Sequence, residues 1–320
     1  MRGARAASWA LLCAAAALLP PAGAEASGFS LAPFPAPATA SATGKLGVGI
    51  YGRVAPDALL AMHPAVLLVE DPELASAKAL RATFPRALIV GRHFVPDGDP
   101  ALANCQDPTE PHEAKGEDFG QIVARMAVPL KGVVDAWVGD NEQASSADPA
   151  SLSCHAQFEL GFVRRLQGRY GVPAVVGNDA SGAVEPEDYA RYFAEPISQA
   201  AYFGVHAYGK PGAATLQSTD NGYYALRYRL IHDALIQAGA ALPKSGFLLT
   251  ETGLYDGWRG QASPASFVAD LLWLEQQIEQ DDYVRGQMIF GLGVGDQYRG
   301  YELQGSPVPD MLGRLWPAAS

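Results

Sequence analysis

Eight short apolar segments, separated by longer stretches with helical patterns, constrain the fold of this chain more than any other feature. They are nearly continuous runs of Val, Ile, Leu, Ala and Gly rather than alternating apolar and polar residues. Such runs are typical of parallel strands that are covered by helices. We therefore expect strands in the ranges Leu46–Arg53, Ala65–Asp71, Ala87–Phe94, Ala136–Glu142, Pro173–Asp179, Phe203–Gly209, Phe247–Gly253 and Met288–Gly293.

Eight strand–helix units predict a single α/β domain over residues 45–320, a (β/α)₈ TIM barrel, because they fill the usual length of about 250 residues. An open, doubly wound sheet is the alternative, but no GxGxxG motif follows the first strand. The longest expected strand-to-helix loops, Val95–Glu117 and Gln143–Ala147, would both lie at the C-terminal face of the barrel.

The first 24 residues have the pattern of a secretory signal peptide. Arg2 and Arg5 precede an apolar run from Ala6 to Leu19, and Ala22–Ala24 provides a small-residue cleavage site. The run is too short for a good membrane span, so we expect a secreted or periplasmic protein without a stable membrane anchor. Residues 25–44 are rich in Ala, Pro and Ser and are expected to form a disordered leader.

The charge balance bears on the partners of the protein. Loss of residues 1–24 would remove Arg2 and Arg5, leaving 21 basic against 34 acidic residues and a net charge of −13 (21 minus 34). A chain this acidic is not expected to bind nucleic acid through a basic surface. It is compatible with a monomeric exported enzyme that acts on a neutral substrate.

Two cysteines remain after the predicted signal peptide. Cys105 and Cys154 form an even pair, and exported proteins mature in an oxidising compartment. We therefore expect a disulfide between them, although two separate thiols remain the alternative.

Polar side chains end several of the expected strands, where a barrel places its functional face. Two are glutamates: Glu142, which follows Asn141, and Glu251. No His and carboxylate set has the spacing of a metal site, no GxSxG motif is present, and no cofactor is expected. Two carboxylates flanking a bond are the requirement of glycoside hydrolysis. The other candidate substrate-binding residues at these ends are Arg92, His93, Asn178, His206 and Tyr208.

This pattern resembles the retaining glycoside hydrolases of clan A, whose TIM barrels carry an Asn-Glu pair on strand four and a Glu on strand seven. The resemblance implies that Glu142 is the acid/base, Glu251 the nucleophile, and Asn141 the partner of the sugar 2-hydroxyl. It also implies a carbohydrate substrate and a hydrogen bond from Tyr208 to Glu251, with His206 nearby. In that mechanism Glu142 needs a raised pKa while Glu251 stays ionised.

The chain departs from the clan pattern at two strands. Many members have an arginine near the end of strand two, where this chain has Glu70 and Asp71, so Arg92 or Arg53 would substitute. Strand eight lacks the tryptophan that often floors the sugar site, and we expect Trp258 to supply that platform.

Other interpretations stay open from the sequence alone. Glu251 could be a structural carboxylate paired with Arg92, Asn141-Glu142 could cap a turn, and His206 could be a core residue. The protein could then be a non-catalytic carbohydrate-binding barrel, or a barrel hydrolase of another class such as a metal-dependent deacetylase or esterase. The glycosidase hypothesis predicts that the carboxyl groups of Glu142 and Glu251 lie about 5 to 5.5 Å apart.

Overall fold

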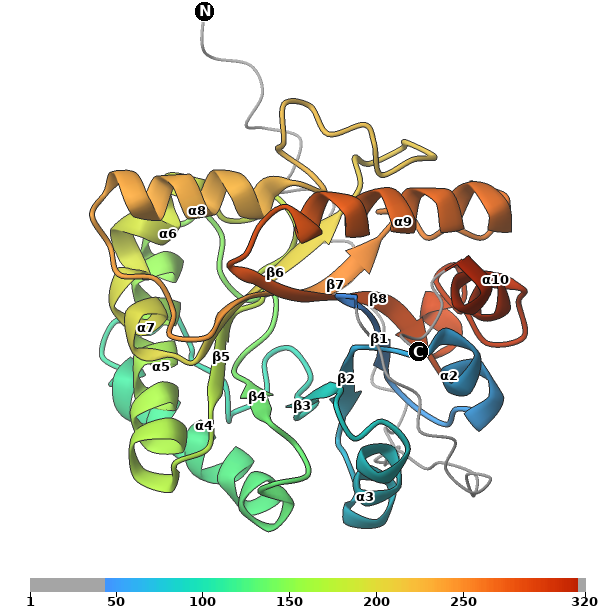
Figure 1. The fold of residues 1–320 in the computed structure, drawn as a ribbon. Coiled ribbons are helices and arrows are strands. Elements are labelled where there is room, and N and C mark those ends of the chain that lie inside the picture. Colours follow the sequence, from blue (N-terminus) through green and yellow to red (C-terminus); the bar gives the residue numbers. More distant parts are fainter. Residues whose placement is uncertain (1–43, 316–320) are drawn as a thin grey trace, which may run out of the picture.

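The strands of the computed structural model close into a parallel barrel in sequence order, β1 to β8, which confirms the predicted TIM barrel (Figure 1). The structure describes residues 44–315, so the expected signal peptide and all but the last residue of the expected leader lie outside the described part. The strands are β1 Leu46–Ile50, β2 Val66–Glu70, β3 Leu88–Arg92, β4 Ala136–Val138, β5 Ala174–Gly177, β6 Tyr202–Tyr208, β7 Gly246–Gly253 and β8 Val284–Leu292.

Helices surround these strands on the outside of the barrel (Figure 1). Several begin with proline in the first turn, where its missing amide hydrogen costs nothing. Asp148 and Ser263 cap two of them by accepting hydrogen bonds from backbone amides. The helices are α2 Pro56–Met62, α3 Leu74–Thr83, α4 His112–Ala127, α5 Pro149–Val163, α6 Pro186–Tyr192, α7 Ala194–Gln199, α8 Arg227–Gln237, α9 Pro264–Glu279 and α10 Val308–Leu315.

Three short helical turns complete the described elements: η2 Val128–Leu130, the π-helical η3 Arg164–Arg169, and η4 Asp296–Tyr298. The expected loop Val95–Glu117 is wrong at its far end, because α4 begins at His112. Its first turn contains only one acidic residue, Glu113, and no side chain caps it. The usual start signals are therefore weak there.

The barrel interior is a small apolar cluster that is separate from the larger core between strands and helices. Val66 and Leu68 of β2 and Val90 of β3 belong to the inner cluster. Because successive residues of a strand alternate in direction, Glu70 and Arg92 continue the inward-facing rows. These two residues are register partners at the C-terminal ends of their strands. They therefore lie at the mouth of the barrel.

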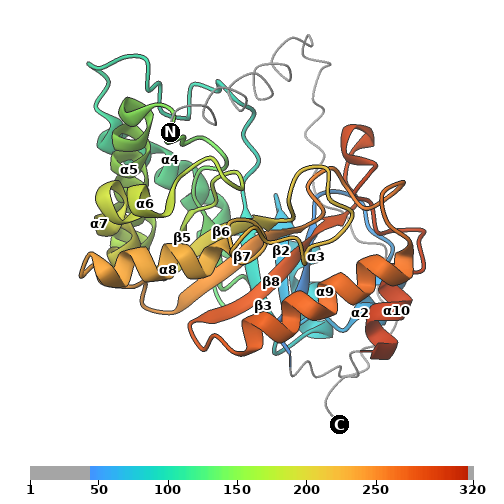
Figure 2. The ribbon, with the colours of Figure 1, turned by 90° about the horizontal axis from the view of Figure 1, so that it is seen from above.

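The loops that follow the strands gather on one side of the barrel (Figure 2). One of them, after β3, is joined to α5 by the disulfide Cys105–Cys154, with Cα atoms 5.6 Å apart. The predicted disulfide is confirmed, and Cys154 lies inside α5. Within residues 44–315, no helix is long and apolar enough to cross a membrane.

Candidate active site

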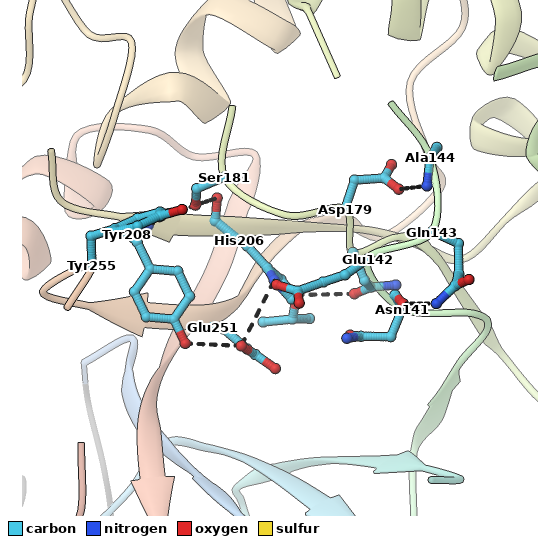
Figure 3. A network of polar contacts seen from close by, with 12 residues as sticks. Asn141, Glu142, Gln143, Ala144, Asp179, Ser181, His206, Tyr208, Glu251 and Tyr255 are labelled. Atoms are coloured by element: carbon cyan, nitrogen blue, oxygen red, sulfur yellow. Dashed lines mark hydrogen bonds and ion pairs between the residues drawn. The ribbon is translucent and has the colours of Figure 1, made fainter. Parts of the chain in front are cut away.

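The two predicted glutamates meet at the mouth of the barrel. Glu251 lies in β7, and Glu142 lies in the loop after β4 with a left-handed backbone (φ 57°). One carboxylate oxygen of each, together with a ring nitrogen of His206, lie within 4.8 Å of one another. Figure 3 shows the three side chains converging from the loop after β4, from β6 and from β7. We call Glu142, His206 and Glu251 the mouth group.

Glu251 is held by two donors. Arg92 Nη1 donates to its Oε1 over 2.8 Å, and the Tyr208 hydroxyl donates to its Oε2 over 2.9 Å. Only 8% of its side chain is exposed. The Tyr208 contact is the one that the clan A resemblance implied. These two hydrogen bonds hold the buried carboxylate in one orientation.

Glu142 has a different environment, since 44% of its side chain is exposed. Its Oε1 accepts a hydrogen bond from His206 Nδ1 over 2.8 Å, and the same nitrogen lies 3.7 Å from Glu251. Desolvation would raise the pKa of Glu142, but the hydrogen bond and charge of His206 outweigh it and hold that pKa below its usual range. This differs from the raised pKa that we expected for an acid/base.

His206 responds in the opposite direction. Burial would lower the pKa of its imidazole, but the carboxylates of Glu251 and Glu142 outweigh burial and raise it. In the free protein the shared proton therefore belongs on His206 Nδ1, hydrogen-bonded to Glu142.

The loop that carries Glu142 is fixed from behind. The Glu142 amide donates to the Asn178 carbonyl over 3.0 Å, and the Ala144 amide donates to Asp179 Oδ1 over 3.1 Å. Asp140, two residues before Glu142, pairs through Oδ2 with His155 Nδ1 at 3.0 Å. These bonds position the glutamate without contacting its carboxylate.

Asp140, His155, Glu159 and Asp179 form a second cluster of acids and histidine, which we call the buried group. Each of these four residues is at most 6% exposed. His155 Nε2 also contacts the disulfide at Cys105 Sγ over 3.1 Å, and Glu159 Oε1 accepts from the Gly177 amide over 2.6 Å. The sequence pattern gave no sign of His155 or Glu159 because both lie within the helix α5.

Burial dominates the titration of this buried group. Burial, reinforced by the charges of Asp140 and Asp179, raises the pKa of Glu159 well above its ordinary value. Burial and the charge of Asp140 raise the pKa of Asp179 to about 6. For His155, burial would lower the pKa, but its bond to Asp140 outweighs that and raises it.

A further carboxylate, Glu70, lies beside the mouth group. In the sequence it stands out only as a position where this chain differs from the clan A pattern. Its Oε2 is 3.7 Å from Arg92 Nε, on the other edge of the guanidinium that binds Glu251. Burial raises the pKa of Glu70 to about 7, although Arg92 opposes the shift. The charge of Arg92 is therefore shared between two acids.

Two predicted substrate-binding residues are misplaced. Asn178 is fully buried and accepts from the Thr250 hydroxyl over 2.9 Å, so it is not accessible to a sugar. Trp258 is only 4% exposed, because it stacks on Phe267 and Arg259 covers the ring with its guanidinium carbon 4.8 Å from the centroid. The expectation of a Trp258 platform is therefore wrong.

Two other predicted substrate-binding residues, His93 and Asn141, lie at the rim of the barrel mouth. His93 pairs with Asp71 at 2.7 Å and ties the ends of β3 and β2 together. Asn141 adjoins Glu142 and is partly exposed near the mouth group (Figure 3). Exposed aromatic side chains that the sequence did not single out also lie in these loops, namely Phe94 at 46% and Tyr298 at 45% exposure.

The mouth group could also coordinate a cation, since two carboxylate oxygens and a ring nitrogen lie within 4.8 Å. Arg92 already places a positive charge 2.8 Å from Glu251, which disfavours a second cation there. The other candidate set, Cys105, Cys154 and His155, contains two sulfurs that are tied in the disulfide.

Comparisons with known proteins concern the fold. No family model and no curated protein sequence matches the chain. Among solved structures, a modular endo-β-1,4-mannanase of glycoside hydrolase family 26 from Cellulomonas fimi is 13% identical, with a TM-score of 0.58 over 86% of this chain and 71% of that one.

Two further glycoside hydrolases give similar values. A glycoside hydrolase family 10 protein from Paenibacillus barcinonensis is 14% identical (TM-score 0.55, 87% of this chain, 97% of that one). A family 30 endoxylanase from Clostridium papyrosolvens is 13% identical (TM-score 0.52, 87% and 73%). The chain shares its (β/α)₈ barrel fold with clan A glycoside hydrolases, as the resemblance predicted.

Proposed function

We propose that this protein is an exported, retaining glycoside hydrolase that cleaves O-glycosidic bonds of an oligo- or polysaccharide. The observation that carries the proposal is the pair of glutamates at the barrel mouth, with carboxylate oxygens within 4.8 Å of each other. Retaining enzymes need such a short separation, because no water has to fit between the nucleophile and the sugar. The disulfide supports export.

In the first step Glu251 attacks the anomeric carbon while Glu142 gives a proton to the departing glycosidic oxygen, and a glycosyl ester forms on Glu251. Arg92 and Tyr208 orient the attacking carboxylate, which they contact directly. In the second step Glu142 accepts a proton from water, which attacks the ester and releases the sugar with retained configuration.

The His206–Glu142 contact adds a requirement to the first step. The proton rests on His206 in the free protein, so it must move to Glu142 before the leaving oxygen can be protonated. A bound sugar would cover the exposed part of Glu142 and remove water from it. Desolvation favours the neutral acid, and this would shift the proton along the 2.8 Å hydrogen bond toward Glu142.

The test is a screen of aryl glycosides together with mannan, xylan and β-glucan, because the solved structures of similar fold include a mannanase and an endoxylanase. Hydrolysis by the wild type should disappear in Glu251→Ala and persist in Glu187→Ala, a control change of an exposed acid in α6. Binding of a glycan without hydrolysis by the wild type would instead support a non-catalytic carbohydrate-binding barrel.

A metal-dependent hydrolase is the second candidate, because the mouth group has a possible ligand set. Dialysis against EDTA separates the two. We expect glycoside hydrolysis to be unchanged by the chelator, since each step above uses side chains and water but no metal ion. Loss of hydrolysis that Zn²⁺ or Ca²⁺ restores would favour the metal-dependent enzyme.

A further inference from the structure

Glu70 occupies a position at the barrel mouth from which it can reach a bound sugar. It ends β2, continues the inward-facing row of Val66 and Leu68, and pairs in register with Arg92. Its side chain is 16% exposed, so part of the carboxylate remains accessible from the mouth. Arg92 links it directly to Glu251.

The carboxylate of Glu70 has too few donors for its burial. Among residues 44–315 no hydrogen bond to it is formed, and its nearest cation, Arg92 Nε, is 3.7 Å away. A largely buried carboxylate without donors is costly, and native proteins rarely leave one. The contact with Arg92 does not remedy this, because Arg92 makes its short bond of 2.8 Å to Glu251.

The neighbouring Tyr51 hydroxyl is buried and also has no partner among the described residues. The Tyr51 ring folds back over the barrel interior, where Gly49 makes room for it: a Cβ at Gly49 would lie 2.5 Å from the Tyr51 ring. Arg92 lies over this ring, with its guanidinium carbon 5.9 Å from the centroid. The β1–β2 side of the mouth therefore holds two polar groups without hydrogen-bond partners.

We propose that Glu70 binds a donor group, a hydroxyl or an ammonium, of the sugar held next to Glu251, and that it selects neutral or amino sugars over uronic acids. The inference rests on the proposed glycosidase function and names the substrate class of the same site. A sugar carboxylate placed there would face Glu70 and Glu251, while the one cation between them, Arg92, is already shared. A donor group would supply the missing hydrogen bond.

Kinetics at pH 8, where Glu70 is ionised, test the role with Glu70→Gln and the matched control Glu73→Gln, an exposed acid just before α3. A lost hydrogen bond to a charged group should raise KM by about tenfold or more. The kcat for dinitrophenyl glycosides should change by less than about threefold, because Arg92 still holds Glu251. The control should match the wild type. A lower kcat on every substrate with unchanged KM would show that Glu70 only positions Arg92, and would overturn the proposal.

Binding measurements keep the test independent of turnover. Calorimetric titration with the methyl glycosides of glucose, glucosamine and glucuronic acid compares the three classes. The wild type should bind the glucoside or the glucosaminide, and the tighter of the two identifies whether a hydroxyl or an ammonium group binds Glu70. It should bind the glucuronide at least about tenfold more weakly. In Glu70→Gln the affinity for the glucuronide should differ less from the affinities for the other two glycosides. Equal or preferred binding of the glucuronide by the wild type would reject the inference, whereas absence of hydrolysis with this selectivity intact would reject only the catalytic proposal.

Discussion

The barrel contains two clusters of carboxylates and histidine that use the same residue types in opposite ways. The mouth group of Glu142, His206 and Glu251 opens to solvent, with 44% of the Glu142 side chain exposed. The buried group of Asp140, His155, Glu159 and Asp179 lies behind the same loop, each residue at most 6% exposed. In each cluster one histidine pairs with one acid, at 2.8 and 3.0 Å respectively.

The difference between them lies in what balances the charges. At the mouth, Arg92 and Tyr208 hold Glu251, and His206 keeps the pKa of Glu142 low. In the buried group, burial raises the pKa of the acids Glu159 and Asp179 instead. A cluster of acids and histidine therefore indicates chemistry only where a substrate can reach it. The buried group holds the loop in place, and the mouth group is the one available for reaction.

The largest expected effect is at Glu251. Glu251→Ala should lower turnover of every substrate by about 10⁴-fold or more, because no glycosyl ester can form. The measurement is kcat/KM on the best glycoside from the screen, with Glu159→Gln in the buried group as the comparison. Glu159→Gln should retain activity within about tenfold. Equal losses in both variants would end the distinction between the two groups.

Glu142→Ala should lose less on substrates whose leaving group needs no proton. With dinitrophenyl glycosides the first step proceeds and the glycosyl-enzyme accumulates, because no base activates water. Azide needs no general base, so it should restore turnover and give a glycosyl azide of retained configuration, identified by NMR. If azide instead gave the inverted product with Glu142→Ala and the retained product with Glu251→Ala, the two roles would be exchanged.

The disulfide offers a way to disturb the buried group alone. It closes a loop with a sequence separation of 49 residues and contacts His155. Cys105→Ser with Cys154→Ser should lower the free energy of unfolding by about 3 kcal/mol, measured in urea. KM and kcat of the folded double variant should stay within about threefold of the wild type. A large fall in kcat would show that the pinned loop and α5 shape the mouth group directly.

The smallest effect is the dependence of stability on pH. Acids whose folded pKa is raised, such as Glu159 and Asp179, add stability below their ordinary pKa, and lose it as the pH rises through the folded value. Asp179 loses its contribution up to about pH 6, and Glu159 loses its own as the pH rises through its raised pKa, so the melting temperature should fall between pH 5 and pH 8. Glu159→Gln should weaken that fall.

Glu142 supplies the comparison from the mouth group. Its folded pKa is lowered, so its contribution is present above its ordinary pKa and is lost as the pH falls through the folded value. Glu142→Gln should therefore flatten the fall between pH 5 and pH 8 less than Glu159→Gln does, and only because it removes a charge that raises the pKa of His206. If the melting temperature fell less steeply in Glu142→Gln than in Glu159→Gln, the mouth group would dominate this pH dependence.

Much of this arrangement could be predicted from the sequence. Apolar runs that end in polar residues gave all eight strands and brought Glu142, Glu251, His206, Tyr208 and Arg92 to one mouth. This works because parallel strands of a barrel end at one face. The clan A resemblance implied the Tyr208–Glu251 bond, but periodicity alone could not.

The failures concern where a side chain points after its strand ends. Asn178 has a left-handed backbone (φ 64°), and its amide fills the space left by Gly204, where a Cβ would lie 1.9 Å from Asn178 Oδ1. Trp258 is removed from the surface by Phe267 and Arg259, from α9 and its own loop. Both outcomes depend on local dihedral angles and on distant packing, which residue type does not encode.

The left-handed backbone of Glu142 lowers stability at a residue that the proposed reaction needs. A residue with a Cβ at φ 57° costs about 1 to 2 kcal/mol, a cost that glycine would not incur and asparagine would reduce. Glu142→Gly would relieve that strain while deleting the proposed acid/base. A laboratory search for heat-tolerant variants that never assayed hydrolysis could therefore accept the loss of this glutamate. Selection for a more thermostable variant therefore requires an assay of hydrolysis in every round.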